Sequence, residues 1–245
     1  MVSIQDKHNF QAVLFDLDGT LLRAEMTQFV PRYVQALADY CATWVKPKKF
    51  EQVLLQAIRD LIHEEGDGRI TNEERVYARM RRDLGLSEER LSDSLEHFRL
   101  HQLAELRNLI RPIPLARQIV QECQRKGIPL VLATNPVFPR FIIQARMQWA
   151  ELDENWFAHL TSYENSHYCK PQPGYFRHLS DLLGVEPQNC LMVGNDLQHD
   201  LAAVAVGMPA YLVDTWKVER DGPEWPCLYR GDHGALQRFL SEQLS

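Results

Sequence analysis

Four short apolar runs along the chain predict buried β-strands. None of them alternates apolar with polar positions, which is typical of strands that helices cover on both faces of a parallel sheet. The three later runs lie beside a Gly or Pro that can turn the chain. The runs are residues 12–15, 128–133, 190–193 and 210–213.

Helical periodicity fills the intervals between these runs, at residues 114–125, 139–149, 174–183 and 198–206. Strands that alternate with helices indicate βαβ units with right-handed crossovers. A last helix is expected at residues 235–244, after an irregular surface loop at residues 221–232 that is rich in Pro, Gly and charge. The pattern therefore predicts an α/β fold with a doubly wound, Rossmann-like parallel sheet.

The stretch from residue 23 to residue 111 interrupts this alternation. It contains no strand-like segment, only amphipathic helical pattern broken at Pro47, at residues 66–68 and at Gly85. Apolar residues recur there at spacings of three to four, so each helix should bury one stripe. We expect a separate helical domain at residues 23–111, inserted into an α/β core that consists of residues 1–22 and 112–245.

Composition and charge narrow the class of protein. A chain of 245 residues with 45% hydrophobic content can bury a substantial core. Its net charge of −6 provides no basic surface for nucleic acid. No apolar run approaches the roughly 18 residues of a membrane span and no secretory pattern is present, so we expect a cytoplasmic protein without a membrane partner. The five cysteines are scattered and never spaced as Cys-x-x-Cys, and we expect reduced thiols.

Two carboxylates follow the first predicted strand. Side chains alternate along a strand, so Asp16 and Asp18 project on one side while Leu17 turns into the core. Two like charges this close are costly unless a cation or a shared proton compensates them, and a hard divalent ion is the usual solution. Two other interpretations stay open. One is a plain polar turn, and the other is a calcium loop in which Gly19 takes the sixth position and Glu25 the last.

Three further polar motifs follow in order along the chain. After Val-Leu-Phe-Asp-Leu-Asp-Gly-Thr-Leu at residues 13–21 come Leu-Ala-Thr-Asn at residues 132–135 and Lys170-Pro171 with Pro173. Met-Val-Gly-Asn-Asp at residues 192–196, with Asp200, completes the set. Together the four resemble the motifs of the haloacid dehalogenase-like (HAD) hydrolase superfamily. They also lie at or after predicted strand ends, where doubly wound sheets bind their ligands.

The resemblance implies a covalent mechanism on a phosphate ester. Asp16 would be the nucleophile that forms an aspartyl-phosphate. Asp18 would protonate the leaving alkoxide and then deprotonate the attacking water. Mg²⁺ would be bound by the Asp16 carboxylate, the Asp18 backbone carbonyl and Asp196, and it would neutralise charge on the transferring group.

The same resemblance implies that Thr134, Asn135 and Lys170 bind the substrate. The Thr134 hydroxyl, the Asn135 backbone N–H and the Lys170 ammonium would contact the phosphoryl oxygens. Taken alone, a Thr-Asn pair after a strand is usually a turn or a cap, and a Lys before Pro is usually a solvated loop residue. Only the joint order of the motifs favours the functional interpretation.

The fourth motif departs from the commonest family pattern, in which the metal-binding Asp follows Gly directly. Asn195 intervenes here, so either Asp196 takes the ligand position or the strand end is shifted by one residue. Asp196 is favoured, because an uncharged Asn is a poorer ligand. Asp200 is expected to support the metal site through Asp196 without touching the ion. The alternative for Asp200 is a helix-start carboxylate that the helix dipole favours.

The long helical insertion resembles superfamily members with a cap after the first strand. Such a cap closes over the site and selects the substrate. Its arginines are candidate contacts for a second anionic group, although such a run is more commonly a solvated helix face. These residues are Arg69, Arg75, Arg79, Arg81 and Arg82.

The favoured function is a Mg²⁺-dependent phosphatase, a monomer or homodimer, acting on a small phosphorylated metabolite. A phosphomutase or phosphotransferase on the same fold would pass the phosphoryl group to a sugar. Haloacid dehalogenation is disfavoured by Asp18, because that reaction has no leaving alkoxide to protonate. A catalytically silent phosphate-binding module is the remaining alternative, although a scaffold has no need for clustered acids that destabilise it.

Overall fold

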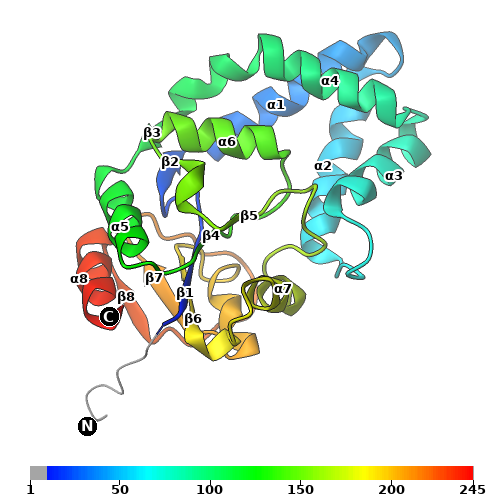
Figure 1. The fold of residues 1–245 in the computed structure, drawn as a ribbon. Helices are drawn as coiled ribbons and strands as arrows, with labels where there is room; N and C mark the ends of the chain where they lie inside the picture. The colour runs from blue at the N-terminus through cyan, green and yellow to red at the C-terminus, as the bar shows by residue number, and fades with distance from the viewer. Residues whose placement is uncertain (1–9, 245) are drawn as a thin grey trace.

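The computed structural model describes residues 10–244, with a parallel β-sheet at the centre of the fold (Figure 1). Its six strands lie in the order β5-β4-β1-β6-β7-β8, and all neighbours are parallel. The predicted α/β fold with a doubly wound parallel sheet is confirmed. The strands are β1 (Ala12–Phe15), β4 (Leu130–Leu132), β5 (His159–Leu160), β6 (Cys190–Gly194), β7 (Ala210–Val213) and β8 (Tyr229–Gly231).

Helices cover both faces of this sheet. They are α5 (Pro114–Arg125), α6 (Arg140–Trp149), α7 (Pro173–Leu183) and α8 (His233–Gln243), with short 3₁₀ helices η3 (Glu154–Trp156), η4 (Pro187–Asn189) and η5 (Leu201–Val206). Phe15 belongs to one apolar cluster with Ile119 of α5, whereas Leu14 belongs to the opposite cluster with Phe176 of α7. Because both faces of β1 are buried, its sequence shows no polar alternation.

A second group of helices lies together at the top of the view in Figure 1. It contains α1 (Met26–Tyr40), η1 (Cys41–Thr43), α2 (Pro47–His63), α3 (Asn72–Leu84), α4 (Glu88–His101) and η2 (Leu103–Leu109). Local sequence sets the ends of α3: Thr71 and Glu74 form a capping box, and Gly85 ends the helix in the left-handed region at φ 67°. The assignment of residues 23–111 to a domain of its own stays a prediction.

The two chain crossings between this helical group and the sheet form an antiparallel pair, β2 (Leu22–Ala24) and β3 (Ile110–Pro112). The expectation of no strand between residues 23 and 111 is therefore wrong at both ends. The two crossings lie side by side, and the hydrogen bonds between them satisfy their backbone N–H and C=O groups. Because this pairing does not require an apolar run, these strands leave no sign in the sequence.

Two further segments differ from the expected elements. Within residues 198–206, only the 3₁₀ helix η5 forms, and the N–H groups of Gln198 and His199 before it donate to the Asp196 carboxylate. In the expected surface loop at residues 221–232, β8 pairs with β7 in parallel. Such an edge strand is held by backbone pairing, which a hydrophobic pattern does not reveal.

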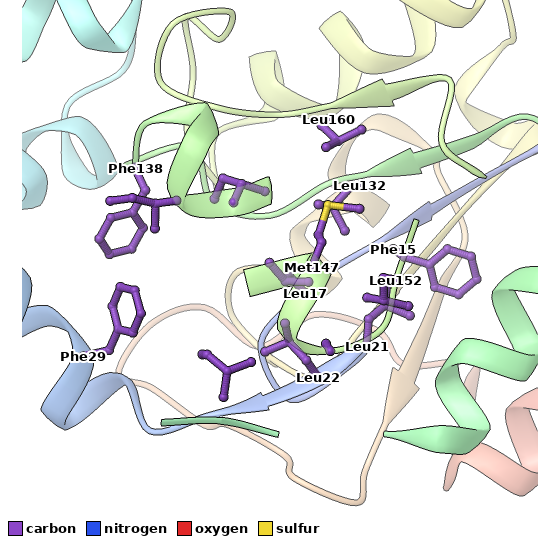
Figure 2. Packing of buried hydrophobic residues seen from close by; sticks show 14 of the residues in the cluster. Phe15, Leu17, Leu21, Leu22, Phe29, Leu132, Phe138, Met147, Leu152 and Leu160 are labelled. Carbon is purple, nitrogen blue, oxygen red and sulfur yellow. The ribbon is translucent and has the colours of Figure 1, made fainter. Parts of the chain in front are cut away.

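The helical group contacts the α/β core through side chains that lie near the carboxyl edge of the sheet. Phe29 of α1 and Phe138, on the loop after β4, are both buried, and their rings meet edge to face at 6.0 Å (Figure 2). The buried Gln172 donates its amide to the carbonyls of Leu61 (2.8 Å) and Glu64 (3.1 Å) at the end of α2. The loop that precedes α7 thereby holds one end of α2.

Two further features of the described chain are the length of its helices and the state of its cysteines. None of the helices within residues 10–244 is long and apolar enough to cross a lipid bilayer. All five cysteines are free, and four of them are buried. Burial raises the pKa of the Cys123, Cys169 and Cys190 thiols, so these side chains are unreactive parts of the packing.

Candidate active site

Lys170 brings two of the predicted acids together at the carboxyl edge of the sheet. Its Nζ lies 2.7 Å from Asp16 Oδ1 and 2.6 Å from Asp200 Oδ1. Asp16 follows β1, Lys170 precedes α7 and Asp200 follows β6, so three distant segments converge. The three side chains are 11%, 3% and 1% exposed, respectively. The first, third and fourth motifs are therefore in direct contact.

Burial governs the protonation of this cluster. It raises the pKa of Asp16 to about 7; Lys170 opposes the rise, and Asp200 and Asp18 add to it. For Lys170, burial alone would lower the pKa, but attraction to Asp16 and Asp200 outweighs it and raises the pKa. Lys170 is thus a permanent cation, and its single charge does not fully offset the burial of the Asp16 carboxylate.

Asp18 contacts a residue that lies outside the four motifs. The guanidinium of Arg146, on α6, donates to Asp18 Oδ1. Arg146 is fully buried, with its Cζ 5.4 Å from the Phe29 ring centre and 5.8 Å from that of Phe138. Within residues 10–244 its Nε has no hydrogen-bond partner. The carboxylate of Asp18 is therefore held where the helical group meets the core.

The loop after β4 presents Thr134 and Asn135 to the same edge. The Thr134 carbonyl accepts hydrogen bonds from Thr161 Oγ1 (2.7 Å) and from the Tyr175 hydroxyl (2.8 Å). The Asn135 side chain exchanges two hydrogen bonds, both 3.2 Å, with the backbone C=O and N–H of Lys170. The second and third motifs are thus joined, which fixes the loop that carries Thr134.

Asn195 and Asp196 have different partners at the end of β6. The Asn195 amide donates to the Trp216 carbonyl at 2.5 Å. Asp196 accepts from the His199 N–H (2.9 Å) and from Arg220 Nε (2.5 Å). Burial alone would raise the pKa of Asp196, but His199 and Arg220 together with the backbone N–H lower it below the ordinary value. Asp196 is therefore ionised at neutral pH.

Two glycines allow these segments to approach one another. A Cβ on Gly194 would lie 2.2 Å from Asp200 Oδ2, which accepts the Asp196 N–H at 2.9 Å. Gly19 has φ +83°, and a Cβ there would lie 2.1 Å from the Asn195 amide nitrogen. A side chain at either position would displace a residue of the fourth motif.

A cavity of about 600 Å³ opens over this edge of the sheet. All the predicted site residues line it: Asp16, Asp18, Thr134, Asn135, Lys170, Asp196 and Asp200. The helical group adds apolar side chains from α1 and α2. Arg69, Arg75, Arg79, Arg81 and Arg82 are absent from the described lining. Arg79, for example, pairs with Asp60 and Asp83 on the surface of the helical group.

The family follows from comparison of the sequence with known families. A profile of the haloacid dehalogenase-like hydrolases matches residues 10–207, a range that includes all four motifs. The chain belongs to this family. The predicted HAD resemblance and the prediction of a hydrolase are therefore confirmed.

Individual relatives agree with this assignment. The chain is 28% identical to a phosphoglycolate phosphatase of Neisseria gonorrhoeae, over 80% of this chain and 77% of that protein. It is 25% identical to one of Haemophilus influenzae, over 81% and 83%. A pyrophosphatase PpaX of Anoxybacillus flavithermus is 22% identical over 80% of this chain and 79% of its own length.

Solved structures share the fold. A HAD phosphatase from Thermococcus onnurineus matches with a TM-score of 0.59 and 21% identity, over 96% of this chain and all of that one. An L-2-haloacid dehalogenase from Xanthobacter autotrophicus matches with a TM-score of 0.55 and 18% identity, over 96% of this chain and all of that one. Both chemistries therefore occur on this architecture, and the site residues have to distinguish them.

The oxygen donors that the family resemblance implies are of the chemical type that a hard divalent cation binds. Within residues 10–244, no three His, Cys, Asp or Glu side chains form a group that would hold a metal ion. The implied set is different, because it consists of two carboxylates, Asp16 and Asp196, and the backbone carbonyl of Asp18. Both carboxylates line the cavity, and the raised pKa of Asp16 marks a buried charge that a cation would offset.

Arg146 and Arg220 contact site acids, yet sequence reasoning did not select them. Arg146 lies in the amphipathic helix α6, where Arg is an ordinary surface residue. Its position on the buried face, between Ile143 and Met147, is the signal that the sequence carries. Arg220 lies in a loop after β7, and no spacing connects it with Asp196.

Proposed function

We propose that this protein is a Mg²⁺-dependent phosphatase that hydrolyses a small phosphorylated metabolite through an aspartyl-phosphate at Asp16. The observation that carries the proposal is the contact of Lys170 Nζ with Asp16 Oδ1, 2.7 Å, inside a cavity that Thr134 also lines. The contact supports the proposal, because a Lys ammonium beside the Asp16 carboxylate is suited to binding the oxygens of a phosphoryl group that Asp16 would attack. Relatives named phosphoglycolate phosphatase and pyrophosphatase support phosphate chemistry.

In the first step, an Asp16 carboxylate oxygen attacks phosphorus, and the bond from phosphorus to the ester oxygen breaks. Lys170, the Thr134 hydroxyl and the Asn135 N–H bind the phosphoryl oxygens and stabilise the charge that develops on them. The Asp18 carboxyl group donates its proton to the leaving alkoxide. The products of this step are the free alcohol and the aspartyl-phosphate.

In the second step, water attacks the phosphorus of the aspartyl-phosphate. Asp18, now a carboxylate, accepts the water proton, and Asp16 leaves as a carboxylate. Inorganic phosphate departs and both acids return to their starting forms. The Arg146 guanidinium donates to Asp18 Oδ1 and orients this carboxyl group for both proton transfers.

Asp16, Asp196 and the Asp18 backbone carbonyl would hold Mg²⁺, which supplies charge neutralisation for the transferring phosphoryl group. Asp196 is the better candidate than Asn195, because a charged carboxylate oxygen binds a hard cation better than a neutral amide oxygen does. Asp200 positions Asp196 by accepting its backbone N–H at 2.9 Å. Thr20, whose hydroxyl lies 3.4 Å from Asp16 Oδ2, helps to orient the nucleophile.

The wider assignment is part of the same proposal. Residues 23–111 form a cap over a core of residues 1–22 and 112–245. The enzyme works in the cytoplasm as a monomer or homodimer, with no nucleic-acid or membrane partner. Asp18 favours phosphate-ester hydrolysis over dehalogenation, since only the former needs a proton for an alkoxide.

Phosphate release from a panel of phosphorylated metabolites tests this function. The panel includes phosphoglycolate and pyrophosphate, which the relatives' names suggest, and 2-chloropropionate with chloride release as the dehalogenase arm. Beryllofluoride with Mg²⁺ should form an adduct at Asp16 that mass spectrometry or ¹⁹F NMR detects. Absence of phosphate release and of the adduct would contradict the proposal and favour a catalytically silent module.

A further inference from the structure

We infer that the cavity accepts a phosphate monoester whose leaving group is uncharged and largely apolar. The inference rests on the proposed phosphatase function and adds the substrate class. A small leaving group with a second anionic group, such as that of phosphoglycolate, is the competing class. The side chains opposite the phosphoryl site distinguish the two classes.

The wall that faces the catalytic edge is built by α1 and α2. These helices contribute Met26, Thr27, Val30, Ile58 and Ile62 to the described lining. None of the five is ionisable, and four are apolar. Met26, Val30, Ile58 and Ile62 are only partly buried, so they present apolar surface to the cavity. Apolar surface of this kind gains free energy when an apolar group displaces water from it.

This wall is held in place relative to the phosphoryl site. The Gln172 amide donates to the carbonyls of Leu61 and Ile62, at 2.8 and 3.3 Å. Gln172 is two residues from Lys170, so one loop fixes both the catalytic cation and the apolar wall. On the other side, Phe138 follows Thr134 by four residues and also lines the cavity. The spacing between phosphate and leaving-group sites is therefore built into the fold.

Two of the three Lys and Arg side chains in the described lining already pair with acids. Lys170 pairs with two acids, and Arg220 pairs with Asp196. Arg23 is exposed on β2, with its Cζ 5.1 Å from the ring centre of Trp216. Glu25, directly before α1, also lines the cavity, and its carboxylate lies 3.8 Å from the Arg111 guanidinium. A carboxylate placed against the α1 and α2 wall would lose its hydration without a partner.

The cavity is also larger than a two-carbon leaving group requires. Its volume of about 600 Å³ lies within the range of roughly 300–1,000 Å³ that is typical of sites for larger small molecules. An extended apolar leaving group would fill the space beside Val30, Ile58 and Ile62. A two-carbon acid would leave most of this surface in contact with water.

A series of alkyl phosphates tests the inference with the full-length enzyme and Mg²⁺. The value of kcat/KM is measured for ethyl, butyl and hexyl phosphate and for 2-phosphoglycolate. The alcohols leave with similar pKa, so differences within the alkyl series report on binding of the leaving group. Hexyl phosphate should exceed both ethyl phosphate and 2-phosphoglycolate by at least about tenfold, since each buried methylene contributes up to about fourfold.

Matched variants test whether the preference for a longer alkyl group depends on the apolar wall of the cavity. Val30→Thr changes a cavity residue without changing its shape, and Val53→Thr makes the same change on α2 outside the described lining. The ratio of hexyl to ethyl turnover should fall severalfold in Val30→Thr and stay unchanged in Val53→Thr. Ile58→Lys should shift the preference toward 2-phosphoglycolate by adding a cation to the wall.

The possible outcomes distinguish the inferred substrate class from the proposed phosphatase function. Equal turnover of ethyl and hexyl phosphate, or a tenfold preference for 2-phosphoglycolate, would overturn the apolar leaving group and leave the phosphatase intact. Loss of a 2-phosphoglycolate preference in Arg23→Gln would then place an anion site at Arg23. Failure to hydrolyse any phosphate ester, together with no beryllofluoride adduct at Asp16, would instead refute the phosphatase itself.

Discussion

The buried guanidinium of Arg146 donates to the carboxylate of Asp18, across 128 residues of sequence. Asp18 lies in the first motif, whereas Arg146 lies on α6 between the second and third motifs. The pair also touches the boundary with the helical group, because Phe29 of α1 lies 5.4 Å from the guanidinium carbon. The acid that we propose for proton transfer is thus oriented by a residue that the family motifs do not include.

Replacement of Arg146 should slow the reaction more for poor leaving groups than for good ones. Arg146→Met removes the contact that orients Asp18, and kcat for ethyl phosphate should fall by about 10- to 100-fold. The fall for p-nitrophenyl phosphate should be smaller, because its leaving group needs no proton. Arg146→Lys should recover part of the rate, since it restores a cation. Arg140→Met, on the exposed face of the same helix, is the control.

A double-mutant cycle separates this role from a purely structural one. Arg146→Met and Asp18→Asn should be non-additive in the free energy of unfolding, by about 0.5–3 kcal/mol. Additive effects on both stability and kcat would show that the two side chains do not act on each other.

Asp16→Asn should reduce hydrolysis by a factor on the order of 10³ or more, because an amide cannot form the aspartyl-phosphate. Circular dichroism should show an unchanged fold. Asp39→Asn, an exposed change on α1, serves as the control and should retain full activity. Undiminished turnover in Asp16→Asn would remove this residue from the mechanism.

The raised pKa of Asp16 predicts a pH dependence that is coupled to Mg²⁺. The protonated acid can neither attack phosphorus nor bind a cation, and its pKa is about 7 instead of the ordinary 3.8. At limiting Mg²⁺, kcat/KM should therefore fall as the pH is lowered from about 8 to about 6. Saturating Mg²⁺ favours the carboxylate and should move this fall to lower pH. A profile that is flat over this range at both Mg²⁺ concentrations would contradict the prediction.

Asp196→Ala should weaken the activation by Mg²⁺ far more than Asn195→Ala does. Asp196 offers a charged oxygen to the ion, whereas Asn195 offers only a neutral amide oxygen. The measurement is a Mg²⁺ titration of phosphate release in each variant. The opposite order would assign the ligand position to Asn195.

Arg220→Gln should lower the Mg²⁺ concentration needed for half-maximal rate. Arg220 Nε lies 2.5 Å from Asp196 Oδ2, so its charge opposes cation binding there. The effect should be a few-fold only, because the Arg220 side chain is 51% exposed and screened by solvent. Arg230→Gln, which removes a charge beside Asp214, is the control.

Gly194→Ala should destabilise the fold by about 1–3 kcal/mol and impair the site, because the new Cβ would collide with Asp200. Gly234→Ala offers a matched control in α8, where the nearest side-chain atom would lie 3.4 Å from the added methyl group. Thermal unfolding and phosphate release should both distinguish the variants. Equal melting temperatures would show that Asp200 can move aside without cost.

Several strands and helices of the α/β core were predicted correctly from the local pattern of apolar and polar residues. The expected strands at residues 12–15 and 210–213 coincide with β1 and β7, and the expected helix at residues 114–125 coincides with α5. The two strands are buried on both faces and appear as continuous apolar runs, whereas α5 is buried on one face and shows a helical period. The strands β2, β3 and β8 show neither signal, because backbone pairing between chain crossings or at a sheet edge places few demands on side chains.

The amino-acid sequence by itself determined which residues are candidates for the chemistry, since each motif is short and lies at the end of a local element. Only the tertiary structure decided the partners of those residues. Lys170 lies between Asp16 and Asp200, Arg146 holds Asp18, and apolar side chains of α1 and α2 face them across a cavity. Such contacts depend on how distant segments pack and on which face of a helix turns inward, and these relations are set by the whole core rather than by neighbours in the chain.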